Sequence, residues 1–451
     1  MNHFAVTLTA LTALTALSCS APGGDPAQRA ERDFYLGGIQ IHEESLDGWF
    51  DGLEQHGLNT VHITDYAVQG EWDSDDLRFE AGKPWLVDEI RAAKRRGLSV
   101  ALVLRVHLDD ELERNAFLWH GMIVPKTDSL LRSWFTKYTR YCLEWARIAE
   151  AEGVDVLFFA SEMNALASTR PADHVPQLEE YFLNDQKQQE RRENIEAQRQ
   201  MIEESETSFA AKKRIDDVEN YLDTRIRNEQ EWARTVVGDA QDASVLNRRR
   251  EQLQGHWGEL TGALRGVYSG PLGYAANFDQ FHDVGFWPQV DVMGINAYFP
   301  LRNQLFDAFN AEALYPLLLD GWRQALHQLD AFRAANGLGL PVIFTELGYT
   351  WRRRSTLKPW EHEGFSVIYG DSDDQRRVVV WQDQPRELRE RALAIRALRQ
   401  AHGELETPFL RGILYWKLSS HDYHEADEPY VIHIGKSSRD PALAELRAFV
   451  G

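Results

Sequence analysis

Two glutamates, each at the end of an apolar run, could together carry out acid–base and nucleophilic chemistry. Glu162 ends the run VLFFASE and Glu346 ends the run VIFTE. When two carboxyl groups flank a glycosidic bond, one can protonate the departing oxygen while the other attacks the anomeric carbon. Retaining enzymes hold them about 5 to 5.5 Å apart, and inverting enzymes leave a wider gap for water. The pair therefore predicts a glycoside-hydrolysing site with Glu162 and Glu346 as catalytic residues.

The two roles require different pKa values. We expect burial and repulsion from the neighbouring carboxylate to raise the pKa of the acid, and hydrogen bonds to keep the nucleophile ionised. Tyr298 and Arg105 are candidate donors to the nucleophile. Trp416 offers a flat face against which a sugar ring could stack, although it could also be a packing residue. Together with the other polar residues at or just after the predicted strand ends, they form the candidate substrate-binding set: Arg105, His107, Asn164, Asn277, Asn296, Tyr298 and Trp416.

Eight short segments rich in β-branched and aromatic residues would position these side chains. Amphipathic helical stretches separate most of them, which predicts a parallel sheet, and eight repeats predict closure. The sequence thus predicts an α/β protein with a single (β/α)₈ barrel over residues 33–451. An open doubly wound sheet is the competing fold, but no Gly-rich phosphate-binding motif follows the first segment. The predicted strands are 34–42, 58–66, 98–107, 154–162, 272–278, 290–299, 341–349 and 412–418.

The connection between the fourth and fifth predicted strands is far longer than the others. Residues 173–250 are rich in Glu, Gln, Arg and Asn, with apolar residues at Ile215, Val218, Leu222 and Ile226. This pattern predicts an insertion of two or more long polar helices projecting from the catalytic face. It could be a solvated excursion, or it could bind a protein partner or flank the cleft.

The N-terminus has the pattern of an export signal. Residues 4–18 form an apolar run that is too short for a membrane span, and it ends at Cys19. The Ala-Leu-Ser-Cys sequence resembles a bacterial lipobox, which predicts lipidation of Cys19; ordinary cleavage nearby is the alternative. We therefore expect a signal peptide over 1–19, a flexible linker over 20–32, and a periplasmic, outer-membrane or secreted protein.

The composition of the chain limits the classes of molecule that it could bind. The formal charge of −21 opposes nucleic-acid binding, which depends on Lys and Arg, whereas a neutral polysaccharide meets no such penalty. Cys142 is the only cysteine after Cys19, and its helical surroundings predict a small buried residue. We expect no cofactor and no metal, and membrane contact only through a lipid anchor.

The chain also resembles glycoside hydrolase family 113, in the large clan of barrels with glutamates on strands four and seven. The resemblance implies a retaining β-1,4-mannan hydrolase with Glu162 as acid/base and Glu346 as nucleophile. Ser161 stands where many clan members carry Asn before the acid/base. The similar stretches are TKYTRYCLEWARIAEAEGVDVLFFASE, YSGPLGYAANFDQF, VDVMGINAYFPL, PVIFTELGY, ILYWKL and GKSSRDPALAELRAF.

Two other functions remain open at this point. The chain could be a carbohydrate-binding or scaffolding barrel without turnover that presents its insertion to a partner. It could also be a metal-dependent hydrolase that uses His107 with Asp65 or Asp109, although no His-x-His or His-Glu-x-x-His arrangement is present. Release of reducing ends from polysaccharides would separate the first alternative from an enzyme, and activity in a chelator would test the second.

Overall fold

The computed structural model describes residues 29, 32–171, 196, 218–237, 243–369 and 376–450. The predicted signal peptide, Cys19 and most of the predicted linker lie outside the described residues, as does most of the insertion before residue 218. Two described residues of the predicted linker contact the barrel. Arg29 donates to the carbonyl of Val154 (3.0 Å) and Arg32 donates to the hydroxyl of Ser99 (3.1 Å).

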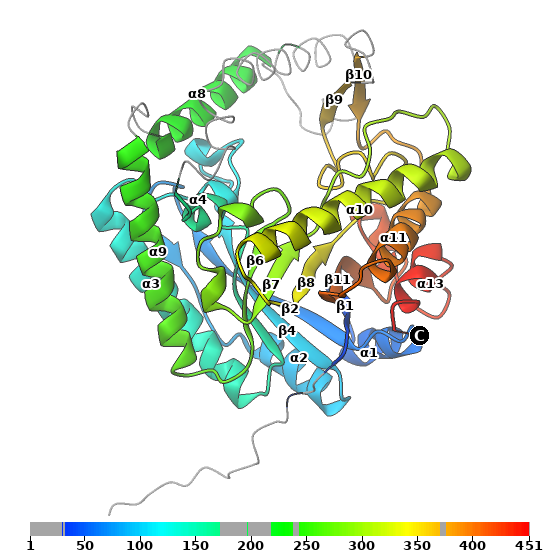
Figure 1. Cartoon of the computed structure of the whole chain (residues 1–451), viewed down its shortest axis with the longest axis horizontal. Helices are drawn as coiled ribbons and strands as arrows, with labels where there is room; N and C mark the ends of the chain where they lie inside the picture. The colour runs from blue at the N-terminus through cyan, green and yellow to red at the C-terminus, as the bar shows by residue number, and fades with distance from the viewer. Residues whose placement is uncertain are drawn as a thin grey trace, which may run out of the picture.

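Eight parallel strands form a closed barrel at the centre of the molecule, surrounded by helices (Figure 1). Each strand pairs with its neighbours in chain order, and β1 pairs with both β2 and β11, which closes the ring. All eight segments predicted as strands are strands of this barrel. They are β1 (Tyr35–Gln40), β2 (Thr60–Gln69), β4 (Ser99–Leu108), β5 (Val156–Ser161), β6 (Leu272–Asn277), β7 (Val292–Asn296), β8 (Val342–Leu347) and β11 (Leu410–Ser419).

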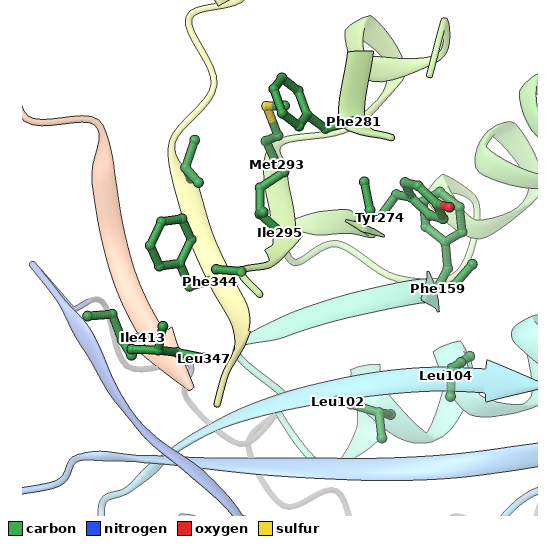
Figure 2. Close-up of a cluster of buried hydrophobic side chains, with 14 of the residues drawn as sticks. Leu102, Leu104, Phe159, Tyr274, Phe281, Met293, Ile295, Phe344, Leu347 and Ile413 are labelled. Carbon is green, nitrogen blue, oxygen red and sulfur yellow. The ribbon is translucent and has the colours of Figure 1, made fainter. Parts of the chain in front are cut away.

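The strand side chains alternate between two cores. On β4, Ala101 and Val103 belong to a small cluster that draws members from most of the strands, an arrangement that only the barrel interior allows. Leu102 and Leu104 belong to the larger core between the strands and the helices, part of which Figure 2 shows. Burial on both faces explains why several strands read as nearly continuous apolar runs.

Helices cover most of the outside of the barrel. The 24-residue α3 begins after Thr127, whose hydroxyl accepts from the backbone N–H of Leu130 (3.2 Å). Its buried face includes Trp134 and Cys142, so the prediction that Cys142 is a small buried residue is confirmed. The main helices are α1 (Leu46–Gln55), α2 (Pro84–Arg95), α3 (Asp128–Ala151), α8 (Val218–Val237), α9 (Ala243–Arg265), α10 (Ala311–Ala335), α11 (Leu388–Gly403) and α13 (Pro441–Arg447).

Bulges interrupt the pairing of β5 and β8 shortly before their glutamates. The β5–β6 register shifts between Phe158 and Ser161, and the β7–β8 register shifts so that Asn296 pairs with Glu346. A bulge changes which face of the sheet the following side chains occupy. On β8, Phe344 and Leu347 both lie in the outer core, three residues apart, so the simple alternation is broken between them. This break directs Glu346 toward the barrel opening.

Short elements extend the loops of the barrel. They are β3 (Leu77–Arg78), α4 (Asn164–Ala167), β9 (Phe365–Tyr369), β10 (Arg376–Val380), α12 (His424–Asp427) and β12 (Ile432–His433). The β9–β10 hairpin belongs to the long loop after β8 and stands beyond the barrel on the same side as α8 (Figure 1). Within the described ranges, none of the helices combines the length and apolar character needed to cross a membrane.

Candidate functional site

Three donors surround the buried carboxylate of Glu346 on β8. The Tyr298 hydroxyl donates to Oε2 (2.6 Å), the Asn296 amide donates to Oε1 (2.9 Å), and the Arg105 guanidinium forms an ion pair with Oε1. Burial raises the pKa of Tyr298 well above its usual value, so this hydroxyl keeps its hydrogen. Donors of this kind stabilise the ionised form of a carboxyl group. The expected contacts of Tyr298 and Arg105 with this glutamate are therefore present.

Arg105 on β4 contacts both the carboxylate of Glu346 and the ring of Trp416. Its guanidinium lies 5.0 Å from the ring centre of Trp416 on β11, a distance at which a cation is attracted to the ring face. Burial and the charge of Arg105 lower the pKa of His62 well below its usual value, so this neighbour is neutral. Trp416 is half-buried, which leaves part of its ring available to a ligand.

Glu162 follows the last residue of β5 and has a left-handed backbone conformation, with φ of 52°. Such a conformation costs a non-glycine residue roughly 1–3 kcal/mol and persists only where surrounding contacts impose it. Its backbone N–H donates to the carbonyl of Ala275 (2.8 Å), which anchors the turn to β6. Strain of this kind is concentrated at functional sites, because it aims a side chain that regular geometry would direct elsewhere.

The imidazole of His120 lies against the carboxyl group of Glu162, with 3.1 Å between Nε2 and Oε2. Burial by itself would raise the pKa of Glu162, but the hydrogen bond and charge of His120, together with the charge of Arg105, lower it below its usual value. The expectation that the pKa of this glutamate is raised is therefore wrong. The physical reason is that His120 and Arg105 stabilise the ionised carboxylate by more than burial destabilises it.

Asn296 connects the two glutamates. Its amide nitrogen donates to Glu346 (2.9 Å) and to the hydroxyl of Ser161 (3.2 Å), and a hydrogen bond from Asn296 is among the influences that lower the pKa of Glu162. The hydroxyl of Thr345 donates to the amide oxygen (2.7 Å) and fixes the orientation of the group. Asn296 therefore favours the ionised form of both carboxyl groups.

The other predicted binding residues lie around this centre with different contacts. His107 is exposed near the end of β4, and Asn164 begins α4 two residues after Glu162. The amide oxygen of Asn277 accepts from the backbone N–H of Phe278 (3.0 Å), which orients it toward its own turn. Their roles in binding substrate stay predictions.

The residues of the metal alternative do not converge. Asp65 is buried and accepts hydrogen bonds from Tyr141 (3.0 Å) and Trp145 (2.7 Å), while Asp109 pairs with Arg78 (2.9 Å). Within the described part of the chain, no cluster of three or more His, Cys, Asp or Glu side chains could hold a metal ion. Asp65 thus serves the packing of α3 against β2.

The sequence reasoning missed His120 because it considered only strand ends. His120 lies in η2 (His120–Met122), within the long loop between β4 and α3. The aromatic stretch FLWHGM in an otherwise polar loop was the available signal. Nothing local in that stretch predicts contact with a glutamate from another strand.

Helix α8 of the insertion holds this loop. Asn228 donates to the backbone carbonyls of Glu113 (2.8 Å) and Ala116 (3.2 Å), and the Trp232 indole donates to the carbonyl of Met122 (2.6 Å). Ion pairs add to these contacts, among them Arg114 with Glu231 (2.8 Å). The described part of the insertion therefore packs on the catalytic face and does not simply project from it. Among the described side chains of α8, Asn228, Glu229 and Trp232 are buried and Ile226 is half-buried. The other predicted apolar positions, Ile215, Val218 and Leu222, lie outside the described side chains.

The arrangement combines one carboxylate stabilised by three donors with a second carboxyl group that contacts a histidine. The first is suited to act as an ionised nucleophile. The second, Glu162, can donate and accept a proton. Its lowered pKa makes it a stronger acid, but a smaller fraction of it is protonated at neutral pH. Trp416 provides an apolar surface beside Arg105, which pairs with the first carboxylate. These are the groups that hydrolysis of a glycosidic bond requires.

Comparison with protein families finds a match over more than half of the chain. The family model "Glycoside Hydrolase Family 113" matches residues 41–174 and 244–378, which include both glutamates and exclude α8. No curated protein matches the chain.

Solved structures of similar fold extend over nearly the whole chain. A GH113 β-mannanase from Alicyclobacillus acidocaldarius, in complex with ManMIm, has 15% identity and a TM-score of 0.55, covering 95% of this chain and 98% of its own. A complex of a GH113 β-1,4-mannanase has 17% identity and a TM-score of 0.53, with 92% and 97% covered. Another β-1,4-mannanase structure of the same family has 16% identity and a TM-score of 0.54, with the same coverage. At these identities the likeness shows the fold.

Proposed function

The chain belongs to glycoside hydrolase family 113, and from this premise we propose that it is a retaining enzyme in which Glu346 is the nucleophile and Glu162 the acid/base. Glu346 attacks the anomeric carbon while Glu162 protonates the departing oxygen, which gives a covalent glycosyl-enzyme. Glu162 then removes a proton from water, and the water displaces Glu346. Each step inverts the anomeric carbon, so the product retains the configuration of the substrate.

The observation that carries this proposal is the set of three donors, Arg105, Asn296 and Tyr298, around the carboxylate of Glu346. The Asn296 amide donates to Glu346 (2.9 Å), and a hydrogen bond from Asn296 is also among the influences that lower the pKa of Glu162. Direct attack requires about 5 to 5.5 Å, whereas a water-mediated mechanism requires about 6.5 to 9.5 Å. Arg105 and Tyr298 support the assignment because they favour the ionised state of Glu346.

We propose β-1,4-mannan as the first substrate to test, because the similar structures are described as β-mannanases. Reducing ends released from mannans, glucans and bacterial exopolysaccharides would identify the polymer. No product from any of them would favour the alternative, a carbohydrate-binding barrel without turnover.

Substitution of the two glutamates tests their roles. Glu346→Gln should reduce turnover at least a thousandfold, since it removes the nucleophile. Glu162→Gln should retain more activity on aryl glycosides, whose leaving groups need little protonation, than on polysaccharide. Glu251→Gln, on the exposed face of α9, is the matched control. Undiminished activity of Glu346→Gln would refute the assignment, and a first product of inverted configuration, measured by NMR, would refute retention.

Two further proposals rest on sequence alone. We propose that the protein is exported and that Cys19 is lipidated, which mass spectrometry of the mature N-terminus would test. We also propose that the part of the insertion before α8 is available to a protein partner, which crosslinking in the native host would test.

A further inference from the structure

A cavity of about 160 Å³ lies between α4, α8, α9 and the loop after β4. Asn164, two residues after Glu162, lines the cavity, and so does Trp119, which precedes the histidine in contact with this glutamate. The side chains that hold Glu346 do not line it. The cavity therefore lies near the acid/base Glu162 rather than around the nucleophile.

Aromatic and aliphatic side chains form the walls. Trp232 and Val236 come from α8, Leu246 and Leu253 come from α9, and Trp119 comes from the loop after β4. Helix α8 lies outside the residues that match the family, so this wall is contributed by the insertion of this chain. The α8 contacts with the η2 loop hold the wall in place.

Buried polar atoms point to the kind of ligand. Arg250 is only 2% exposed, and its Nε and Nη2 have no hydrogen-bond partner among the described residues. The same holds for the side-chain oxygen of Gln280, which is 6% exposed, and for that of Asn164. Leaving such groups unpaired is costly. A hydroxyl group can accept from Arg250 and donate to one amide oxygen, so satisfying Arg250, Gln280 and Asn164 requires more than one hydroxyl. A sugar carries several hydroxyls on an apolar ring.

Charge favours a neutral sugar over an acidic one. Arg249 and Arg250 line the cavity, but so do Asp279 and Asp283. Burial raises the pKa of Asp283 to about 7, and the charges of Arg250 and Arg170 offset this effect only in part. A carboxylated sugar would gain from the arginines and lose to the aspartates.

We infer that this cavity binds a neutral sugar unit of the substrate on its leaving-group side, an inference that rests on the proposed role of Glu162. The acid protonates the oxygen that departs, so the part of the substrate beyond that oxygen lies next to the acid. The insertion then contributes to substrate choice by supplying one wall of this subsite.

The test fills the cavity and measures binding separately from turnover. Leu246→Trp should weaken the binding of β-1,4-mannohexaose, measured by isothermal titration calorimetry, by about tenfold or more. Val245→Trp places the same side chain at the neighbouring position of α9, which is 51% exposed and does not line the cavity, and should leave the Kd unchanged. Leu246→Phe, a smaller change, should give an intermediate Kd if Leu246→Trp does not fold.

Kinetics provide the second measurement. The ratio of kcat/KM for mannohexaose to that for 4-nitrophenyl β-mannoside, which carries no sugar on the leaving-group side, should fall in Leu246→Trp. An unchanged Kd, a wild-type protein that does not bind mannohexaose, or tighter binding of a uronic-acid oligosaccharide would overturn the inference. If the wild type binds mannohexaose without hydrolysing it, and Leu246→Trp binds it more weakly, the results would support sugar binding in the cavity and refute the proposed hydrolysis.

Discussion

Removal of the His120 imidazole should shift the pH dependence of catalysis in a defined direction. The ring lies 3.1 Å from the carboxyl group of Glu162 and is the main influence that lowers its pKa against burial. In His120→Ala the pKa of Glu162 should therefore rise. Because a general acid works only while protonated, activity falls as pH rises through this pKa, and the basic limb of the profile should move to higher pH.

The size of the shift follows from the contact. A hydrogen bond to a charged group contributes about 1.5–3 kcal/mol, and 1.36 kcal/mol corresponds to one pKa unit, so loss of the ring corresponds to about one to two units. The His120 side chain is 26% exposed, so water would enter and replace part of the interaction. We therefore expect a shift of about one unit.

The assay is the pH dependence of kcat/KM on a soluble oligosaccharide of the polymer that the wild type hydrolyses. His120→Gln retains an N–H donor and should give a smaller shift. His327→Ala removes an exposed histidine on α10 and should leave the profile unchanged. A basic limb that stays in place or moves to lower pH in His120→Ala would refute the reasoning.

Three further predictions concern Glu346 and the stability of the barrel. Tyr298→Phe removes the 2.6 Å hydrogen bond to Glu346 and should lower kcat about 10- to 100-fold in steady-state kinetics, with unchanged thermal unfolding. Glu390→Gln breaks the buried ion pair with Arg302 (2.9 Å) and should lower the free energy of unfolding by about 3–5 kcal/mol in urea titrations; an unchanged value would contradict the proposed importance of the pair. Burial raises the pKa of Glu89 from 4.5 to about 7, so its contribution to stability is full below pH 4.5 and is lost as pH rises through about 7. Between pH 4.5 and about 7, the free energy of unfolding should fall by up to about 3 kcal/mol less in Glu89→Gln than in the wild type. An identical pH dependence of unfolding in the two proteins would show that groups other than Glu89 cause the fall.

The barrel and its two glutamates could be predicted from the sequence because their signals are local. Strands buried on both faces require continuous apolar runs, and a polar residue at the end of such a run marks the edge of the core. The positions of all eight strands followed from these runs, and α3 followed from apolar residues at helical spacing. Glu162 and Glu346 were recognisable because each interrupts an apolar run where a strand ends.

The surroundings of the glutamates depend on tertiary structure. His120 reaches Glu162 across 42 residues, and the bulge that turns Glu346 toward the opening leaves no mark in the apolar pattern of β8. The polar composition of α8 predicted exposure, yet Asn228 and Trp232 are buried because the loop after β4 offers backbone carbonyls to both. Burial patterns determine where strands and helices form, whereas hydrogen bonds between distant loops determine which charges meet. The sequence alone thus determined the scaffold and the catalytic pair, and the folded chain decided the environment that sets their chemistry.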